Sequence, residues 1–161
     1  MAYDRCFICE STSARSRSSR RQSRHGTHKR GLNTKINIAV DSFGMPVQII
    51  ITSGTIADSS QVPQLIQGIE AQSLVADRGY DTNKVLEAVE EAGMKAVIPP
   101  KKNRREQRDY DRAIYEFRHI VENTFLELKR WRGIATRYAK QTSSYIASVQ
   151  ICCMVMWLKI L

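Results

Sequence analysis

The sequence lacks a hydrophobic run long enough to cross a bilayer, and it lacks a complete set of zinc ligands. Cys6 and Cys9 form a C-x-x-C motif, but no second pair or neighbouring histidine completes the set. The closing apolar segment 146–161 is shorter than the ~20 residues of a membrane span and contains Gln150 and Lys159. The N-terminus has no apolar stretch typical of a signal peptide. We therefore expect a cytoplasmic protein that ends in a buried helix.

Positive charge is the main compositional signal, and it is unevenly placed along the 161 residues. The net charge of +9 indicates an anionic partner, with nucleic acid as the first expectation. Residues 1–30 hold eight Lys and Arg against two Asp and Glu, whereas residues 31–161 hold seventeen against fourteen. The Ser- and Arg-rich stretch 11–30 lacks apolar periodicity, which predicts that residues 1–30 are a disordered basic head. As an alternative, such a head could bind DNA.

From Gly31 onward the sequence predicts one α/β domain, residues 31–161. A hairpin of two strands with a turn at 41–44 comes first, and strands then alternate with helices. This order is typical of a mixed sheet flanked by helices. The expected strands are 34–40, 46–51, 73–77 and 95–100, and the expected helices are 58–69, 82–93, 115–130 and 143–158.

The segment 115–130, YEFRHIVENTFLELKR, is predicted to be one helix that carries a glutamate among cations. At 100° per residue, Tyr115, Arg118, Glu122 and Lys129 fall on one stripe beside the apolar, core-facing stripe. An ion pair between Arg118 and Glu122 would explain the pattern and stabilise the helix by only about 0.2–0.5 kcal/mol. The alternative is that Glu122 borders a polar groove and has a chemical role there.

Asp77 is the second carboxylate at a position suited to chemistry. It ends the apolar strand 73–77, and reactive groups of α/β sheets gather where strands end. The simpler alternative is that Asp77 caps the turn that follows. Carboxylates from two elements of a basic domain suit Mg²⁺ or Mn²⁺, and two such ions about 3.5–4 Å apart can promote phosphodiester chemistry. In that interpretation Arg118 and Lys129 face phosphate instead of pairing with Glu122.

The same stripe carries a resemblance to a known family. Its residues stand as Y-x2-R-x3-E-x6-K, which is similar to the signature of DDE transposases from the group around the fourth and fifth families of bacterial insertion sequences. ADRGYD resembles the block of that family that holds its second catalytic aspartate. Further similar blocks are GLNTKINIAVDSFGMPV (31–47), VIPPKKNR (97–104), YDRAIYEFRHIVEN (110–123) and LKRWRGIATRYAK (128–140), so the resemblance covers residues 31–158.

The resemblance implies a ribonuclease-H-like domain that uses Mg²⁺ or Mn²⁺ to cleave and transfer DNA strands at insertion-sequence ends. Transposon ends and target DNA would be its partners, and a homo-oligomer is one expected form. Asp58 also resembles a recurring family aspartate, although we interpret it first as a helix cap. The implied catalytic metal ligands are Asp77 and Glu122, and the residues implied to bind or position DNA are Tyr115, Arg118, Lys129 and Arg130.

The first aspartate of the family's three carboxylates is not identifiable. The family carries it on the first strand of the sheet, before the block at Gly31, where this sequence reads DRCFICESTSARSRSS. Asp4 is near that place, but the residues around it do not match. We therefore expect a first strand that is missing or corrupted, a truncated C-terminal catalytic portion, and weak or no activity.

Two rival functions stay open from the sequence. A non-catalytic DNA-binding remnant would bind end DNA without magnesium-dependent nicking and could modulate an intact transposase. A different ribonuclease-H-like nuclease would cut RNA–DNA hybrids, although the spacing from Tyr115 to Lys129 argues against it.

A shifted reading frame would explain the unmatched head, and the gene sequence tests it. Codons can be chosen for residues 1–16 that, read one base later, spell WPMIDASYVKVHPHA, which resembles the missing family segment. The hypothesis is that residues 1–27 translate the wrong frame and that the frame is restored before Lys29. Sequencing codons 1–30 should then reveal that string in the shifted frame, and codons that cannot encode it would end the hypothesis.

Overall fold

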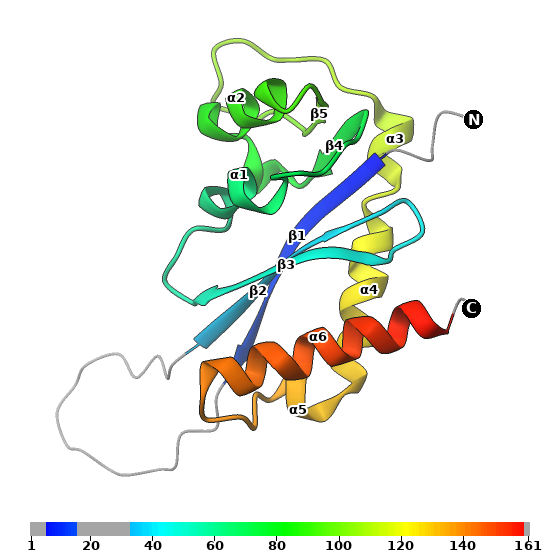
Figure 1. The fold of residues 1–161 in the computed structure, drawn as a ribbon. Helices are drawn as coiled ribbons and strands as arrows, with labels where there is room; N and C mark the ends of the chain where they lie inside the picture. The colour runs from blue at the N-terminus through cyan, green and yellow to red at the C-terminus, as the bar shows by residue number, and fades with distance from the viewer. Residues whose placement is uncertain (1–5, 16–32, 160–161) are drawn as a thin grey trace, which may run out of the picture.

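The structure is a computed structural model that describes residues 6–15 and 33–159 (Figure 1). Five strands form one mixed sheet in the order β3-β2-β1-β4-β5, which confirms the predicted fold class. The first three strands are antiparallel neighbours, and β4 and β5 follow in parallel with β1. The strands are β1 (Cys6–Arg15), β2 (Asn33–Val40), β3 (Pro46–Ser53), β4 (Ser73–Ala76) and β5 (Lys95–Val97).

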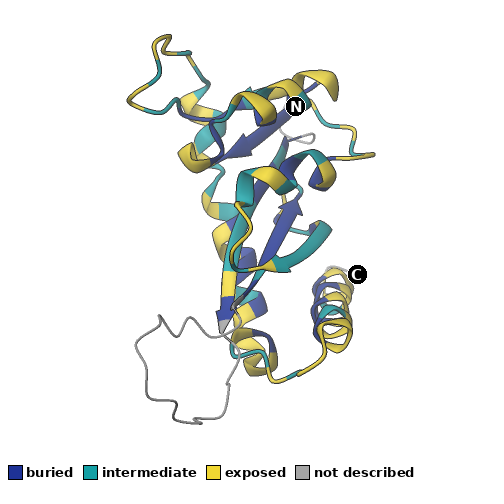
Figure 2. Cartoon of the chain, turned by 90° about the vertical axis from the view of Figure 1, so that its left-hand side faces the viewer, coloured by how far each residue is buried: buried dark blue, intermediate teal, exposed yellow. Residues whose placement is uncertain are grey.

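Helices cover both faces of this sheet; the central strands lie buried between them, whereas the edge strand β3 is mostly of intermediate exposure (Figure 2). One face packs against α1 (Val62–Leu65) and α2 (Asn83–Glu91). The other face packs against α4 (His119–Arg130), α5 (Arg132–Ala135) and α6 (Thr142–Leu158). The short helices η1 (Asp58–Gln61), η2 (Arg78–Tyr80) and α3 (Arg112–Glu116) complete the described elements.

Strand β1 corrects the expectation that the first strand is missing. Residues 6–15, which the sequence assigned to a disordered head, pair with β2 on one side and with β4 on the other. The run CFIC has apolar side chains at successive positions, so both faces of a central strand can be buried. Ile8 and Cys9 are accordingly fully buried. The rest of the head, Asp4 included, lies outside the described residues, and the shifted frame stays a prediction about the gene.

The predicted single helix 115–130 is two helices, α3 and α4. Phe117 and Arg118, between them, keep right-handed helical backbone angles. The hydrogen bonds tighten here to a three-residue spacing, from Arg118 N to Tyr115 O at 3.0 Å and from Ile120 N to Phe117 O at 2.9 Å. Such a tight turn is common where a helix ends. The apolar stripe of α4 is buried as the spacing predicts.

Buried Asp81 holds the basic loop after β5 against the end of β4. Its carboxylate accepts hydrogen bonds from Lys101 N at 2.8 Å, Arg104 Nε at 2.8 Å and Arg108 Nη2 at 2.6 Å. Burial by itself raises the pKa of the Asp81 carboxyl, but these bonds and the two guanidinium charges outweigh it and lower the pKa overall. Asp81 is therefore a structural carboxylate whose oxygens are already engaged.

The closing segment is the helix α6, seventeen residues long. Tyr145, Val149 and Met156 pack it onto the sheet. Within residues 6–15 and 33–159, no helix has both the length and the apolar character needed to cross a membrane.

The turn between β2 and β3 anchors α4, and Gly44 makes that contact possible. Asp41 Oδ1 accepts hydrogen bonds from Phe43 N and Met45 N, as expected of a turn residue. Thr124 Oγ1 of α4 donates to Gly44 O at 2.8 Å. Gly44 has φ +81°, and an added Cβ would lie 3.0 Å from Ile120 Cγ2. The α4 helix therefore sits close against a turn that only glycine fits.

Replacing Gly44 by alanine should cost more stability than replacing Gly93. Gly93 also has a positive φ, +70°, but its Cβ position is open space, so G93A carries the backbone strain alone, about 1–2 kcal/mol. G44A adds the clash with α4 and should lose roughly 1–2 kcal/mol more. Urea unfolding of both variants measures the difference, and equal losses would contradict the packing role of Gly44.

Candidate active site

The parallel pairing of β1 and β4 brings two carboxylates together at one end of the sheet. Cys9 lies opposite Ala76 in the register, so the next residues, Glu10 and Asp77, are neighbours. Val75, two residues before Asp77, belongs to the core on the α4 side, as does Ile8 two residues before Glu10. Because side chains alternate along a strand, Glu10 and Asp77 project toward the side of the sheet that α4 covers.

Side chains from α3 and α4 complete the cluster around these carboxylates. The Tyr115 hydroxyl donates to Asp77 Oδ1 at 3.4 Å. Arg118 Nη1 contacts Glu10 Oε1 at 3.4 Å, and Arg118 Nη2 contacts Glu122 Oε1 at 2.7 Å. Three carboxylates from β1, the end of β4 and α4 are thereby linked to one guanidinium and one phenol.

The contacts of Arg118 correct one interpretation made from the sequence. Arg118 pairs with Glu122, as the simple ion-pair alternative expects, and does not face away from it toward a phosphate group. The Glu122 side chain is 47% exposed and that of Arg118 is 27% exposed. Arg118 also reaches the side chain of Glu10, which is 23% exposed. The guanidinium therefore balances two carboxylates at once, which a surface helix pair would not do.

Burial and the neighbouring charges act together on Glu10. Burial, the largest cause, raises the pKa of the Glu10 carboxyl; the charge of Arg118 lowers it, those of Glu122 and Asp77 raise it, and that of Lys129 lowers it. The net pKa lies above the ordinary value of glutamate. Glu10 therefore lies within electrostatic reach of both other carboxylates.

Tyr115 and Arg118 also respond to the cluster. Burial and the charge of Asp77 raise the pKa of the Tyr115 hydroxyl, so the phenol stays protonated and can donate a hydrogen bond. Burial lowers the pKa of Arg118, but the carboxylates of Glu122 and Glu10 outweigh it and raise the pKa overall. Arg118 is therefore a fixed cation at the centre of the site.

Asp77 also has the simpler role considered for it, because it precedes η2 and accepts a hydrogen bond from Arg78 N at 2.7 Å. That bond and the one from Tyr115 both reach Oδ1. The cap fixes the carboxylate at the end of β4 without changing the side of the sheet on which it lies. Capping and a role in the site are compatible for this residue.

Asp58 does not cap a helix as the sequence suggested. The N-cap of η1 is Ala57, and the Asp58 carboxylate instead pairs with Lys35 Nζ at 2.9 Å. Asp58 and Lys35 line a pocket of about 400 Å³ whose wall also includes Glu10 and Asp77. This polar pocket is the hollow that opens onto the carboxylate cluster.

Lys129 and Arg130 lie in the last turn of α4, about two turns beyond Glu122. Both are exposed, and Arg130 Nη1 pairs with Glu127 Oε2 at 2.7 Å. The charge of Lys129 lowers the pKa of Glu10, so Lys129 is within electrostatic reach of the cluster. Their role in binding or positioning DNA stays a prediction.

The carboxylates fit a divalent cation chemically, although their present arrangement is not a ready metal site. Within the described ranges, no three Asp, Glu, His or Cys side chains are grouped as metal ligands. Glu10 Oε2 is buried and, among the same residues, has no hydrogen-bond partner. A buried carboxylate oxygen without a partner is costly, and a cation would satisfy it. Oxygen donors of this kind are those that Mg²⁺ and Mn²⁺ prefer.

Glu10 is the site residue that the sequence interpretation missed. It lies in the segment assigned to the basic head, where the search was for an aspartate within a family-like block. The available signal was the short apolar run CFIC, which could have predicted a buried strand ending near a carboxylate, as SLVAD did for Asp77.

The mixed sheet in the order β3-β2-β1-β4-β5, with helices on both faces, is a ribonuclease-H-like fold. The sequence profile of the family described as Transposase DDE domain matches residues 4–157, so the chain belongs to that family. The family is a class of enzymes that carry out DNA transposition and use divalent metal ions. The matched range includes β1, in agreement with its place in the sheet.

Two curated relatives come from insertion sequences. The putative transposase for insertion sequence element IS6501 of Brucella ovis (strain ATCC 25840 / 63/290 / NCTC 10512) is 32% identical over 131 residues, which is 80% of this chain and 100% of the relative. The putative transposase for IS402 of Burkholderia cepacia is 24% identical over 137 residues, covering 77% of this chain and 63% of the relative. The resemblance to insertion-sequence transposases is thereby confirmed.

Solved structures with the same fold are viral integrases. The simian T-cell lymphotropic virus intasome, solved in complex with PP2A regulatory subunit B56 gamma, contains a chain with a TM-score of 0.55 at 10% identity, covering 91% of this chain and 47% of the other. The catalytic core domain of BIV integrase gives a TM-score of 0.51 at 12% identity, covering 93% and 81%. At these identities the likeness concerns the fold alone.

Replacing Glu10 by glutamine should stabilise the protein at neutral pH. The pKa of Glu10 is higher in the folded protein than in the unfolded chain, so folding favours its protonated form. The protein is therefore more stable below the unfolded-state pKa, and it loses that stability as the pH rises through the folded-state pKa. The neutral amide removes that loss. Thermal unfolding should therefore show E10Q melting above the wild type at pH 7 and level with it near pH 4.

The matched control is E116Q, which neutralises an exposed glutamate on α3 outside the cluster. It should leave the melting temperature within about 1 °C of the wild type, as surface substitutions usually do. If E10Q melted below the wild type at pH 7, the repulsion among the carboxylates would be refuted.

Proposed function

We propose that this chain cleaves and joins DNA strands at insertion-sequence ends, with Mg²⁺ or Mn²⁺ held by Asp77, Glu122 and Glu10. Glu10 takes the place of the family's first aspartate, which the sequence did not reveal. When bound, the metal would activate a hydroxyl nucleophile and stabilise the leaving oxygen of the phosphodiester. The remaining steps belong to side chains of the chain itself.

The observation that supports this proposal is that three carboxylates from separate elements meet around two side chains: Arg118 contacts Glu10 and Glu122, and Tyr115 contacts Asp77. In structural ion pairs elsewhere in the described residues, cations match or outnumber the carboxylate, as where Arg130 and Lys159 both pair with Glu127. A cluster with surplus negative charge, next to a polar pocket, is instead what a cation-dependent site requires.

Arg118 has two successive partners in this proposal. Without metal it neutralises Glu122 and Glu10 through the contacts at 2.7 and 3.4 Å. With a divalent cation held by the carboxylates, the Arg118 guanidinium would be available to a DNA phosphate, to which it could donate two parallel hydrogen bonds. Tyr115 meanwhile keeps the Asp77 carboxylate oriented through its hydroxyl.

DNA would lie along α4, with Lys129 and Arg130 contacting the backbone beyond the carboxylates. Both are exposed at the end of the helix, and phosphate contacts of this kind position a duplex without reading its sequence. The integrase relative by fold belongs to an intasome, and an assembly of several copies of this chain on DNA is part of the proposal.

The rival function is a non-catalytic DNA-binding remnant. One observation favours it: Arg118 already occupies Glu122, and no three ligands are grouped for a metal within residues 6–15 and 33–159. The two functions differ in one measurable property. The proposed enzyme gains stability from Mn²⁺ through these three carboxylates, whereas the remnant does not.

Thermal unfolding with and without Mn²⁺, paired with nicking of insertion-sequence end DNA, tests the proposal. Saturating Mn²⁺, at 100 times its dissociation constant, should stabilise the wild type by about 2.7 kcal/mol. D77N and E122Q should lose most of that gain because each removes an anionic ligand, and both should abolish nicking.

The exposed variant E116Q is the control and should retain the Mn²⁺ effect and the nicking rate. E10Q should behave like D77N if Glu10 is the third ligand. Nicking that survives E122Q would refute the site, and Mn²⁺-independent stability with intact DNA binding would establish the remnant instead.

A further inference from the structure

The C-terminal part of the chain has a charge unlike that of the rest of the domain. Residues 128–161 contain six Lys and Arg and no Asp or Glu. Residues 31–127 contain eleven Lys and Arg against fourteen Asp and Glu. The positive charge of the folded domain is therefore concentrated where α4 ends and α5 and α6 begin, and a polyanion is the complementary partner for it.

Two aromatic side chains lie exposed within this basic region. Trp131 is 44% exposed and Tyr138 is 53% exposed, and both line a largely apolar pocket of about 340 Å³. Arg132 stands in the same wall, and Ile151 of α6 contributes from the opposite element. Large aromatic rings are usually buried, so two of them at the mouth of one pocket indicate a binding surface.

The backbone around the pocket holds Tyr138 in this exposed place. Arg137 has φ +43°, a left-handed conformation that a non-glycine residue rarely adopts. Its guanidinium is held by Thr34 and Thr142 and lies over the Tyr145 ring at 5.3 Å. The strained residue is thus fixed by side chains from β2 and α6, and it directs the next residue outward. Such strain persists only where the surroundings enforce it.

A backbone hydrogen bond and a close contact hold Tyr138 beside α5. Tyr138 N donates to Gly133 O at 3.2 Å, and the Tyr138 ring lies near Gly133, where an added Cβ would stand 4.0 Å from Cδ2, an ordinary contact distance. The loop that carries Tyr138 is therefore bonded to α5.

We propose that this pocket, formed by Trp131, Arg132, Gly133, Tyr138 and Ile151, binds an unpaired nucleobase of the DNA substrate. The aromatic rings supply stacking faces, and Arg132 supplies a cation for the phosphate beside that base. A base within a duplex is stacked on both sides, so only an unpaired one can offer a face to Trp131 or Tyr138. This inference rests on the proposed function, because it assumes that the chain engages DNA.

The position of the pocket relative to the carboxylates supports a single-stranded ligand. Trp131 follows directly after α4, nine residues beyond Glu122, which is about 13 Å along a helix. Lys129 and Arg130 lie between them and are exposed. A strand that leaves the carboxylates along α4 would pass these cations and reach the aromatic pocket. Strand separation near the reacting phosphate would provide the unpaired base.

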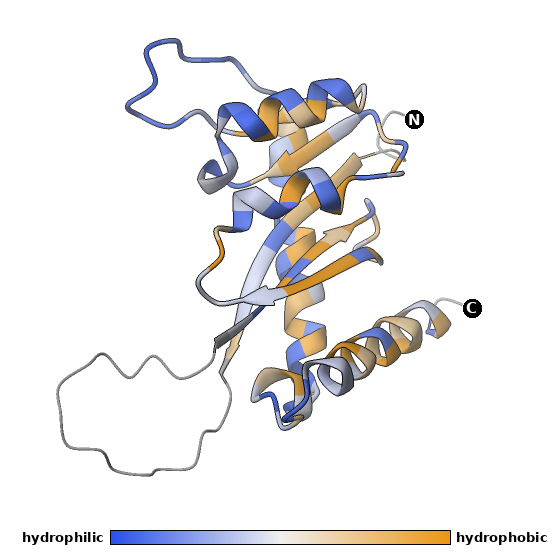
Figure 3. Ribbon diagram, turned by 60° about the vertical axis from the view of Figure 1, so that its left-hand side comes forward, coloured by the Kyte–Doolittle hydropathy of each residue, from blue (hydrophilic) through white to orange (hydrophobic). Residues whose placement is uncertain are grey.

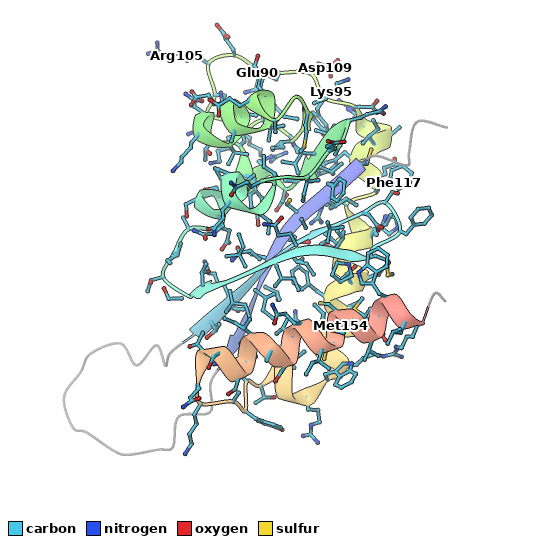
Figure 4. The ribbon with its side chains drawn as sticks, viewed as in Figure 1. Glu90, Lys95, Arg105, Asp109, Phe117 and Met154 are labelled. Carbon is cyan, nitrogen blue, oxygen red and sulfur yellow. The ribbon has the colours of Figure 1, made fainter. Side chains whose placement is uncertain are left out.

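Exposed apolar residues of α6 adjoin the pocket and suggest another possible ligand for this surface, namely a second copy of the chain. Met154, labelled on this helix in Figure 4, and Leu158 are more than 60% exposed, and apolar residues run along α6 in the hydropathy view of Figure 3. A second copy of the chain could cover this face. The charge of residues 128–161 opposes that occupant, because two copies would bring like charges together.

Fluorescence anisotropy of the full chain with two DNA probes tests the proposal. One probe is a blunt duplex, and the other is the same duplex with a single-stranded tail; both are measured without divalent metal. The wild type should bind the tailed probe more tightly. W131L and Y138L should each weaken that binding roughly 5- to 150-fold and leave the blunt duplex within about twofold.

The control is F43L, which removes an exposed aromatic ring at the distant turn between β2 and β3. It should bind both probes like the wild type, and circular dichroism melting checks that all variants fold. Failure of the wild type to bind either probe would overturn both the proposed function and this inference. The inference alone would be overturned if the wild type bound both probes equally well. It would also be overturned if W131L and Y138L bound the tailed probe as tightly as the wild type does. A third contradicting result would be that W131L and Y138L change only the oligomeric state, from dimer to monomer, as measured by analytical ultracentrifugation.

Discussion

The contact of Arg118 with two carboxylates is the interaction on which the site depends. Glu10 comes from the central strand and Glu122 from α4, and their negative charges would repel α4 from the sheet if no cation stood between them. Arg118 supplies that cation at the point where α3 turns into α4. The same guanidinium that balances these carboxylates would compete with a bound metal for them.

This dual role explains why the site resembles an ordinary ion-pair network. The Arg118–Glu122 pair has the spacing and the distance of a common surface pair. What distinguishes it is the surrounding charge: Glu10 is half-buried, its Oε2 lacks a hydrogen-bond partner among the described residues, and Asp77 adds to the repulsion. Asn37 Oδ1 and Arg108 Nε are also buried without a partner among the described residues, so the nearby charges of Glu122 and Asp77, more than the unsatisfied oxygen, set Glu10 apart.

Much of the fold was predictable, because runs of apolar or alternating residues and typical turn residues indicate local structure. The hairpin at Asp41 and the strand that ends at Asp77 are examples. The central strand was not predictable, because all but one of the residues of β1 after Cys9 are polar, Ala14 being the exception, and the surrounding head is basic and Ser-rich. Pairing on both sides by β2 and β4 stabilises that strand, and such long-range partners leave no local signal.

The candidate site was predictable only in part, because some of its residues lie in local sequence patterns and one depends on long-range strand pairing. Asp77 and Glu122 follow recognisable patterns, whereas Glu10 depends on the register between β1 and β4.

The shared site is tested most directly by a crystal structure with Mn²⁺, located by its anomalous scattering. We expect a peak bound by Asp77, Glu122 and Glu10, with Arg118 displaced from Glu122. A peak elsewhere, or none at saturating Mn²⁺, would contradict the account.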